Sequence, residues 1–266
     1  MTTTMTYTVG DSITMLRRNL LHIVRYPGLT IFVIGAPVVF LMLFVFVFGG
    51  TLGAGLPGVD SDGGRTAYLP YVMPGILAMT IAGTAGGTAT TVAMDMTEGI
   101  TARFRTMAIS RAAVLAGHVL GNTVQAVLGV VVVLAVGIAV GFRPNVHPLQ
   151  WFLILGMVLL IAFAISWLAV AMGMASKSVE TASNLPMLLL LLPFLGSGFV
   201  PTDTMPSGLR WFAEYQPFTP FVETLRGLMT GEPLGTNLLL ALAWCAVITL
   251  AGYLWAMAIY EKKSVR

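Results

Sequence analysis

Six long apolar runs constrain this chain more than any other feature of its sequence. A run of about 20 apolar residues is long enough to cross the hydrocarbon core of a bilayer as a helix. The runs do not alternate with polar residues as the strands of an outer-membrane barrel would. The sequence therefore predicts an all-α, polytopic membrane protein, with one transmembrane domain over residues 1–266 and six transmembrane helices. The predicted spans are Leu29–Gly49, Tyr71–Met94, Ala112–Gly141, Trp151–Ala175, Ala182–Val200 and Leu238–Tyr260.

Basic side chains predict how these spans are oriented, because Lys and Arg accumulate in cytoplasmic segments. Only 9% of the residues are charged, and ten of the fourteen basic residues fall in alternate connecting segments. We therefore expect both termini in the cytoplasm, and we expect no nucleic-acid partner because no basic cluster marks a soluble domain. The predicted cytoplasmic set is Arg17, Arg18, Arg25, Arg103, Arg105, Arg111, Lys177, Lys262, Lys263 and Arg266. The opposite set is Arg65, Arg143, Arg210 and Arg226.

Three segments outside the spans also show helical patterns. Residues 11–25 predict an amphipathic helix in the inner membrane interface, serving as an anchor or as part of a gate. Residues 201–236 predict two short outer helices, the second beginning at Thr219 and Pro220 and ending near Gly231. Residues 98–110 are amphipathic, with Ile100, Phe104 and Met107 on one face. The last segment is either a contact for a soluble partner or a basic loop at the interface.

Two spans carry residues that bear on packing or on a transport path. Thr80, Thr84 and Thr88 recur every fourth residue of the second span, beside the small-residue pair Gly83 and Gly87. Such residues permit close helix contact in lipid and equally suit a weakly polar cavity wall. In the fifth span, Pro186 and Pro193 predict kinks, because each removes a backbone donor.

Enzymatic and ion-coupled functions are poorly supported by the residues. The six spans as drawn contain no Asp, Glu, Lys or Arg, and His118 is expected to be a hydrogen-bonded packing residue. A phosphate loop ending at Lys177 would need glycine at two positions where Ala171 and Ser176 stand. An intramembrane hydrolase using Ser197 would need a nearby base, and neither His118 nor His147 is a persuasive one. We expect no enzyme, no metal site and no cofactor in this chain, and an external energy source if it transports.

Two stretches resemble the bacterial type-2 ABC exporter permeases, especially the daunorubicin-resistance-like drug and lipid exporters. They are "EGITARFRTMAISRAAVLAGHVLGN" at residues 98–122 and "FVPTDTMPSGLRWFAEYQPFTPFVETLRGLMTG" at residues 199–231. The resemblance implies a permease that pairs with a second copy or a homologous permease and docks two soluble ATPase subunits, which hold ATP and Mg. It makes residues 11–25 an elbow helix and residues 98–110 a coupling helix. The implied ATPase contacts are Glu98, Ile100, Arg103, Phe104, Arg105 and Met107.

The same resemblance implies a substrate path along the first, second and fifth spans and a lid outside them. The expected path residues are Thr80, Thr84, Thr88, Asn184, Met187, Leu191 and Phe194. The expected lid residues are Trp211, Phe212, Tyr215 and Phe218. We expect a permease that exports a hydrophobic or amphipathic drug, natural product or lipid across the cytoplasmic membrane. Alternatives are a polysaccharide or teichoic-acid exporter of the same fold and a membrane assembly subunit that transports nothing.

Overall fold

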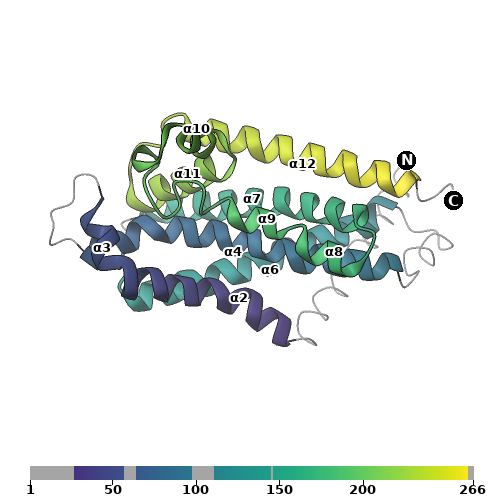
Figure 1. Cartoon of the computed structure of the whole chain (residues 1–266), viewed down its shortest axis with the longest axis horizontal. Coiled ribbons are helices and arrows are strands. Elements are labelled where there is room, and N and C mark those ends of the chain that lie inside the picture. The colour runs from purple at the N-terminus through teal and green to yellow at the C-terminus, as the bar shows by residue number, and fades with distance from the viewer. Residues whose placement is uncertain (1–26, 57–63, 98–110, 145, 263–266) are drawn as a thin grey trace.

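A computed structural model describes all residues except 1–26, 57–63, 98–110, 145 and 263–266, and the described residues form helices joined by turns and loops (Figure 1). No strand occurs among them. The helices are α2 (Pro27–Met42), the π-helix η1 (Leu43–Phe48), α3 (Gly49–Ala54), α4 (Gly64–Thr97), α6 (Arg111–Val140), α7 (Pro148–Ala175), α8 (Val179–Asn184), α9 (Met187–Leu191), the 3-10 turn η2 (Thr202–Thr204), α10 (Ser207–Tyr215), α11 (Phe218–Thr230) and α12 (Asn237–Lys262).

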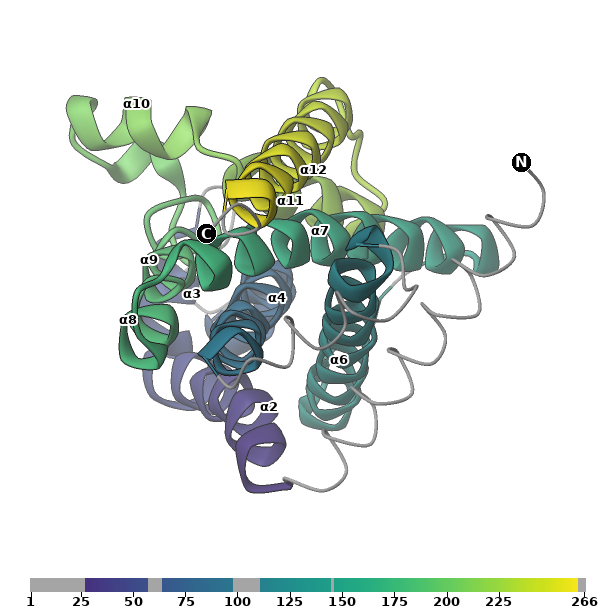
Figure 2. The same cartoon turned by 90° about the vertical axis from the view of Figure 1, so that its right-hand side faces the viewer.

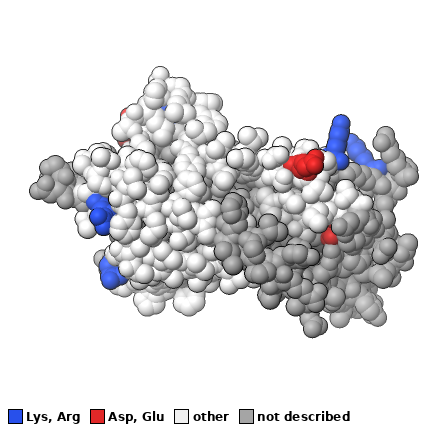
Figure 3. Space-filling view, turned by 60° about the horizontal axis from the view of Figure 1, so that its bottom comes forward, with Lys and Arg blue, Asp and Glu red and all other residues white. Residues whose placement is uncertain are grey.

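The long helices run lengthwise beside one another and define two ends of the bundle (Figure 1). One end holds α3, α10 and α11, and we call it the α11 end. The other holds α8 and the last turns of α4, α7 and α12, and we call it the α8 end. Viewed along the bundle, α10 stands away from the other helices (Figure 2). On the face shown in Figure 3, the charged side chains of the described residues gather toward the two ends, as a lipid-facing middle requires.

Helix α4 is the centre of the bundle. It packs against α2, α6, α7, α8, α9 and α11, and most of its length is buried. Its most apolar window has a mean hydropathy of 1.3, whereas the other four long segments range from 2.1 to 2.7. A helix surrounded by protein, such as α4, does not need apolar residues on every face. Helix α12 exposes Leu239 and Leu250 and therefore needs an apolar outer face.

In the described part of the chain, five segments are long and apolar enough to cross a membrane, so the chain is a polytopic membrane protein. They are Val33–Ala54, Gly64–Thr97, Leu115–Val140, Pro148–Ala175 and Asn237–Lys262. The predicted fifth span, Ala182–Val200, differs from a single helix. It consists of parts of α8, then α9, then a series of turns over residues 192–199, and the break between α8 and α9 falls at Leu185 and Pro186. The missing amide of proline explains that break, and the count of six spans stays a prediction.

Two local expectations need correction. Helix α11 begins at Phe218, after Pro217, rather than at a Thr219 cap, although it does end before Gly231, whose φ of 81° is left-handed. Asp95 lies inside α4, which continues past the predicted end of the second span, so a long apolar helix does contain a buried acid.

The side chain of Cys245 is buried in mid-helix, as expected for a small apolar residue.

Glycines let the helices approach closely, but not at the positions expected. A Cβ added at Gly75 would clash with the carbonyl oxygen of Gly198, and one at Gly129 would lie 2.9 Å from Cγ2 of Thr80. By contrast, a Cβ at Gly83 would meet only Cδ1 of Leu190 at 3.8 Å, and one at Gly87 would meet nothing within 4 Å. The expected Gly83–Gly87 pair therefore makes no close contact with any described part of this chain.

We predict that Gly75→Ala lowers the thermal midpoint of the purified protein in detergent, while Gly87→Ala leaves it unchanged or raises it. Alanine gains about 1 kcal/mol of helix propensity at either position, but at Gly75 the clash with backbone costs about 1–3 kcal/mol. Both variants stand on the same helix, so Gly87→Ala is the matched control. Equal midpoints for the two variants would show that α4 does not approach Gly198 closely.

Candidate functional site

The unwound segment, residues 192–200, is the main irregular backbone packed inside the described bundle. Its backbone approaches α4 so closely that Gly75 and Gly198 are nearly in contact. Only part of its hydrogen bonding is internal, as in the amide of Leu195, which donates to the carbonyl of Leu192, while the amide of Phe194 donates back to Leu191 at the end of α9. Backbone at membrane depth has no water to bond with, so its remaining polar groups need partners from the protein.

Two tyrosines at the start of α4 supply some of these partners. The hydroxyl of Tyr68 donates to the carbonyl of Phe199 at 3.0 Å, and the hydroxyl of Tyr71 donates to the carbonyl of Ser197 at 3.1 Å. Tyr68 is fully buried, and its ring is stacked with that of Tyr71. A buried tyrosine usually satisfies its hydroxyl in this way. Together the two tyrosines fix the unwound segment against α4.

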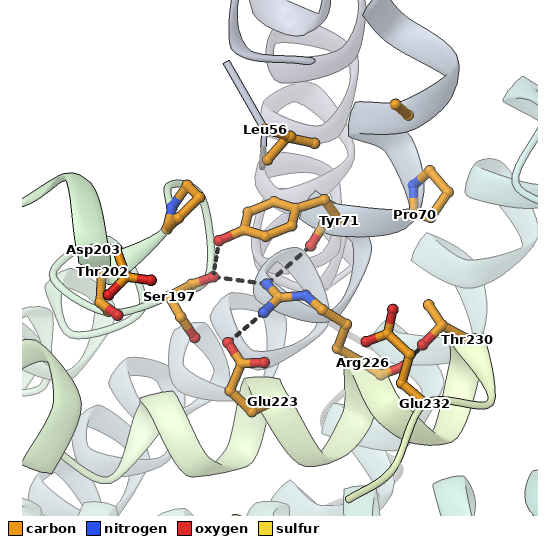
Figure 4. Close-up of a pocket in the computed structure, with 12 residues that line it drawn as sticks. Leu56, Pro70, Tyr71, Ser197, Thr202, Asp203, Glu223, Arg226, Thr230 and Glu232 are labelled. Atoms are coloured by element: carbon orange, nitrogen blue, oxygen red, sulfur yellow. Dashed lines mark hydrogen bonds and ion pairs between the residues drawn. The ribbon is translucent and has the colours of Figure 1, made fainter. Parts of the chain in front are cut away.

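Arg226 of α11 also binds the carbonyl of Ser197, and it thereby joins the unwound segment to α11 as well as to α4 (Figure 4). Its Nη2 donates to the carbonyl of Ser197 at 2.7 Å and to that of Tyr71 at 3.1 Å, and its Nη1 pairs with Glu223. The guanidinium carbon lies 4.0 Å from the centre of the Tyr71 ring. Only 9% of the Arg226 side chain is exposed. A buried guanidinium needs several partners, and those of the two Nη atoms come from α4, α11 and the unwound segment, while Nε has no hydrogen-bond partner among the described residues.

The junction of α10 and α11 completes these contacts. Nε2 of Gln216 donates to the carbonyl of Leu192 at 3.1 Å, and the amide of Ser197 donates to the hydroxyl of Thr219 at 3.3 Å. The Thr219 hydroxyl itself donates to the carbonyl of Ala213 in α10. We call the five side chains that bond the unwound segment the staple residues: Tyr68, Tyr71, Gln216, Thr219 and Arg226.

The apolar side of the unwound segment packs on the first long helix. The ring of Phe194 stacks on that of Phe199 with centroids 4.4 Å apart, and both contact Phe44 of η1, at 6.3 and 4.6 Å. Phe194 also meets Phe40 of α2 edge-on at 5.7 Å. The segment is therefore held by hydrogen bonds on one side and by aromatic packing on the other.

A pocket of about 430 Å³ opens beside the staple residues at the α11 end. Its charged lining residues are Arg226, Glu223, Asp203 and Glu232, and Asp203 pairs with Arg210 of α10 at 2.6 Å. The hydrogen bond that Nε of Arg210 donates to the Glu214 carboxylate raises the pKa of Arg210. The full lining is Leu56, Ala67, Pro70, Tyr71, Ser197, Pro201, Thr202, Asp203, Glu223, Arg226, Thr230 and Glu232.

This arrangement is suited to positioning and binding rather than to hydrolysis. The Ser197 hydroxyl is buried and has no hydrogen-bond partner among the described residues, and no histidine lines the pocket beside it. A serine nucleophile needs an adjacent base, so the described surroundings of Ser197 do not support the hydrolase alternative. In the described part of the chain, no three His, Cys, Asp or Glu side chains are grouped so that they could hold a metal ion.

The residues predicted to contact an ATPase lie outside the described residues. They are Glu98, Ile100, Arg103, Phe104, Arg105 and Met107, and the predicted elbow helix at residues 11–25 lies outside as well.

The predicted path residues lie in three different places. Thr80, Thr84 and Thr88 are buried, and the hydroxyls of Thr80 and Thr84 donate to carbonyls of their own helix. Asn184 and Leu191 are exposed on α8 and α9. Met187 of α9 is exposed as well. Phe194, in contrast, belongs to the aromatic cluster with Phe199 and Phe44. None of the seven lines the pocket at the α11 end, and their role in transport stays a prediction.

The predicted lid residues are also divided. Trp211, Phe212 and Tyr215 are exposed on α10, and the rings of Trp211 and Tyr215 lie 5.5 Å apart. Phe218, in contrast, is 1% exposed and packs against Phe221 in the core. Only the three α10 residues share a surface.

Sequence reasoning missed the staple residues. Arg226 entered only as one of the basic residues of the outer set, and Tyr68, Tyr71 and Gln216 were given no role. One signal was available, because Glu223 and Arg226 are three residues apart in an otherwise apolar helix, a spacing that allows a pair. The partner carbonyls of residues 197 and 199 had no such signal, because the segment looked like a continuous helix.

The fold and its described contacts define the class as a polytopic helical membrane protein whose polar contacts serve to join helices. Residues 12–230 match the family model of the ABC-2 type transporter, so the chain belongs to this family and is a membrane permease. It is 26% identical over 224 residues to "Daunorubicin resistance ABC transporter permease protein DrrB1" of Streptomyces coeruleorubidus, covering 84% of this chain and 76% of the relative. It is 25% identical over 254 residues to "Probable doxorubicin resistance ABC transporter permease protein DrrC" of Mycobacterium tuberculosis (strain CDC 1551 / Oshkosh), covering 90% and 87%.

We predict that Arg226→Met lowers the stability of the purified protein in detergent by about 3–5 kcal/mol, because it leaves Glu223 without its cationic partner and removes one donor from each of the carbonyls of Ser197 and Tyr71. Tyr71→Phe keeps the ring and removes one hydrogen bond, so its cost is about 1 kcal/mol. Arg143→Met is the control, at an exposed arginine that donates to the carbonyls of Ile138 and Phe142, and it should change stability by only about 1 kcal/mol. Unfolding followed by tryptophan fluorescence measures all three, and equal effects of Arg226→Met and Arg143→Met would contradict the assignment.

Proposed function

We propose that this chain is the transmembrane permease subunit of an ATP-driven exporter that moves a hydrophobic or amphipathic compound out across the bacterial cytoplasmic membrane. The observation that carries the proposal is the family match over residues 12–230, on a bundle with five segments able to cross a membrane. Two relatives are named as daunorubicin- or doxorubicin-resistance permeases, which favours a drug-like compound as cargo. The α11 end faces outward and both termini face the cytoplasm, as the basic residues predict.

Energy comes from two soluble ATPase subunits, which bind ATP and Mg. Residues 98–110 serve as the coupling helix, with Glu98, Arg103 and Arg105 making polar contacts and Phe104 the central apolar one. A second permease copy or a homologous permease completes the transporter. Closure of the ATPase pair on ATP moves the coupling helices, and the two permeases rock from inward-open to outward-open.

The outer end is suited to a lid that moves with the bundle. The staple residues bind the unwound segment to α4 and α11, so these three elements form one unit. Helix α10 stands outside this unit, and its exposed Trp211 and Tyr215 are suited to the membrane interface. We assign the lid to α10. Phe218, at the start of α11, is buried in the core and anchors the lid there.

The path runs between the two permeases, along surfaces that this chain leaves exposed. Val47 of η1 and Met187 of α9 are 64% and 61% exposed, and Leu191 is also exposed. A surface lined by such side chains suits an apolar or amphipathic cargo better than a sugar or an ion. This placement favours drug or lipid export over export of a polysaccharide.

The proposal predicts that the protein, extracted in mild detergent from cells that also produce candidate ATPase subunits, retains one of them. The double variant Glu98→Arg/Phe104→Ala should retain at least about tenfold less, because it reverses a charge and removes the apolar contact. A matched control, Glu232→Arg/Leu239→Ala, changes the same residue classes at exposed positions of the α11 end and should retain the ATPase fully.

Two outcomes of this experiment contradict the proposal in different ways. If the wild type retains no ATPase, the chain does not draw its energy from such a subunit. A membrane assembly subunit that transports nothing then explains the protein better. If wild type and both double variants retain it equally, the ATPase is held elsewhere and residues 98–110 are only an interfacial loop.

A further inference from the structure

A buried acid and a histidine meet at the α8 end of the bundle. Nε2 of His118 lies 3.2 Å from Oδ2 of Asp95, and their side chains are 8% and 10% exposed. Asp95 stands in the last turn of α4 and His118 near the start of α6. Ionisable groups inside a membrane bundle are expensive to bury and are usually functional when present.

The rest of the α4–α6 contact does not require this pair. The two helices run antiparallel, and glycines of α6 receive side chains of α4: Gly137 lies against Met73 and Gly129 against Thr80. This close packing already holds the helices together over the middle of the bundle. Apolar residues at positions 95 and 118 would continue it at lower desolvation cost, so stability alone does not account for the pair.

The position of the pair in the chain points to its role. Asp95 is in the helix that leads into residues 98–110, and His118 is in the helix that follows them. The pair therefore joins the two helices that precede and follow that segment in the chain. A buried contact between a carboxylate and an imidazole depends on the separation of two particular atoms, so it restricts sliding of α4 along α6 more than apolar contacts do.

A second polar contact continues from α6 to α7. One turn beyond His118, Nδ2 of Asn122 donates to the hydroxyl of Ser166 at 2.8 Å. Both side chains are buried. This contact has similar burial and lies on the same helix, but it joins α6 to α7 rather than to α4. It provides a natural comparison for the Asp95–His118 pair.

We propose that Asp95 and His118 are positioning residues that lock α4 to α6, so that displacement of residues 98–110 by the ATPase moves both helices as one body. The inference rests on the proposed function, because it takes residues 98–110 as the ATPase contact. Neither residue touches the nucleotide or the cargo. Loss of the lock leaves the ATPase bound while its turnover no longer responds to the permease.

The test uses the full chain in lipid nanodiscs with the ATPase subunit it retains, supplied with MgATP. The variants are Asp95→Leu, the exchange Asp95→His/His118→Asp, and the control Asn122→Leu. The readouts are ATP hydrolysis per bound ATPase, the amount of ATPase bound, and the thermal midpoint. We expect Asp95→Leu to bind the ATPase normally but to hydrolyse ATP about tenfold more slowly per bound ATPase. A factor of this size is typical of the coupling between two sites. The exchange should restore most of it, and Asn122→Leu should keep it.

Three results would overturn the inference while leaving the proposed function intact. They are unchanged hydrolysis in Asp95→Leu, an equal loss in Asn122→Leu, and an exchange variant that binds the ATPase but restores nothing. A wild type that binds no ATPase would instead overturn the proposed function itself, and the binding readout separates that result from the other three.

Discussion

The unwound segment cannot satisfy all of its backbone hydrogen-bonding groups by itself, and the rest of the structure depends on this constraint. A chain that leaves helical geometry inside a membrane protein must find protein partners for its carbonyls. Here the carbonyl of Ser197 alone accepts from Tyr71 and from Arg226, and the carbonyls of Leu192 and Phe199 accept from Gln216 and Tyr68. Because these donors sit on α4 and at the junction of α10 and α11, satisfying the segment also fixes where those helices lie.

The same constraint explains the central place of α4. This helix carries the two tyrosines at its α11 end, the close approach at Gly75 in its first half, and Asp95 at its α8 end. It therefore touches the elements associated with the outer lid and those that flank residues 98–110. A single buried helix that contacts both ends is a physical route by which a movement at one end reaches the other.

Some of this architecture was predictable, and the reasons differ between elements. The apolar runs predicted α4, α6, α7 and α12, because length and hydropathy suffice for a helix in lipid. The end of α11 was predictable from Gly231, a residue type that tolerates the left-handed conformation. The unwinding after α9 was not, since Pro193 predicts a kink but not how many residues lose helical geometry. The pairing of Arg226 with Ser197, 29 residues away in the chain, depends on that unwinding and was equally hidden.

The most direct test of this account is hydrogen–deuterium exchange of a peptide covering residues 192–200, measured by mass spectrometry in nanodiscs. The account predicts slow exchange in the wild type, because the segment is packed and the amides of Phe194, Leu195 and Ser197 are hydrogen-bonded. It also predicts much faster exchange in Arg226→Met, with peptides from the middle of α12 unchanged. Fast exchange in the wild type, or the same slow exchange in both proteins, would contradict the claim that side chains of α4 and α11 hold this segment.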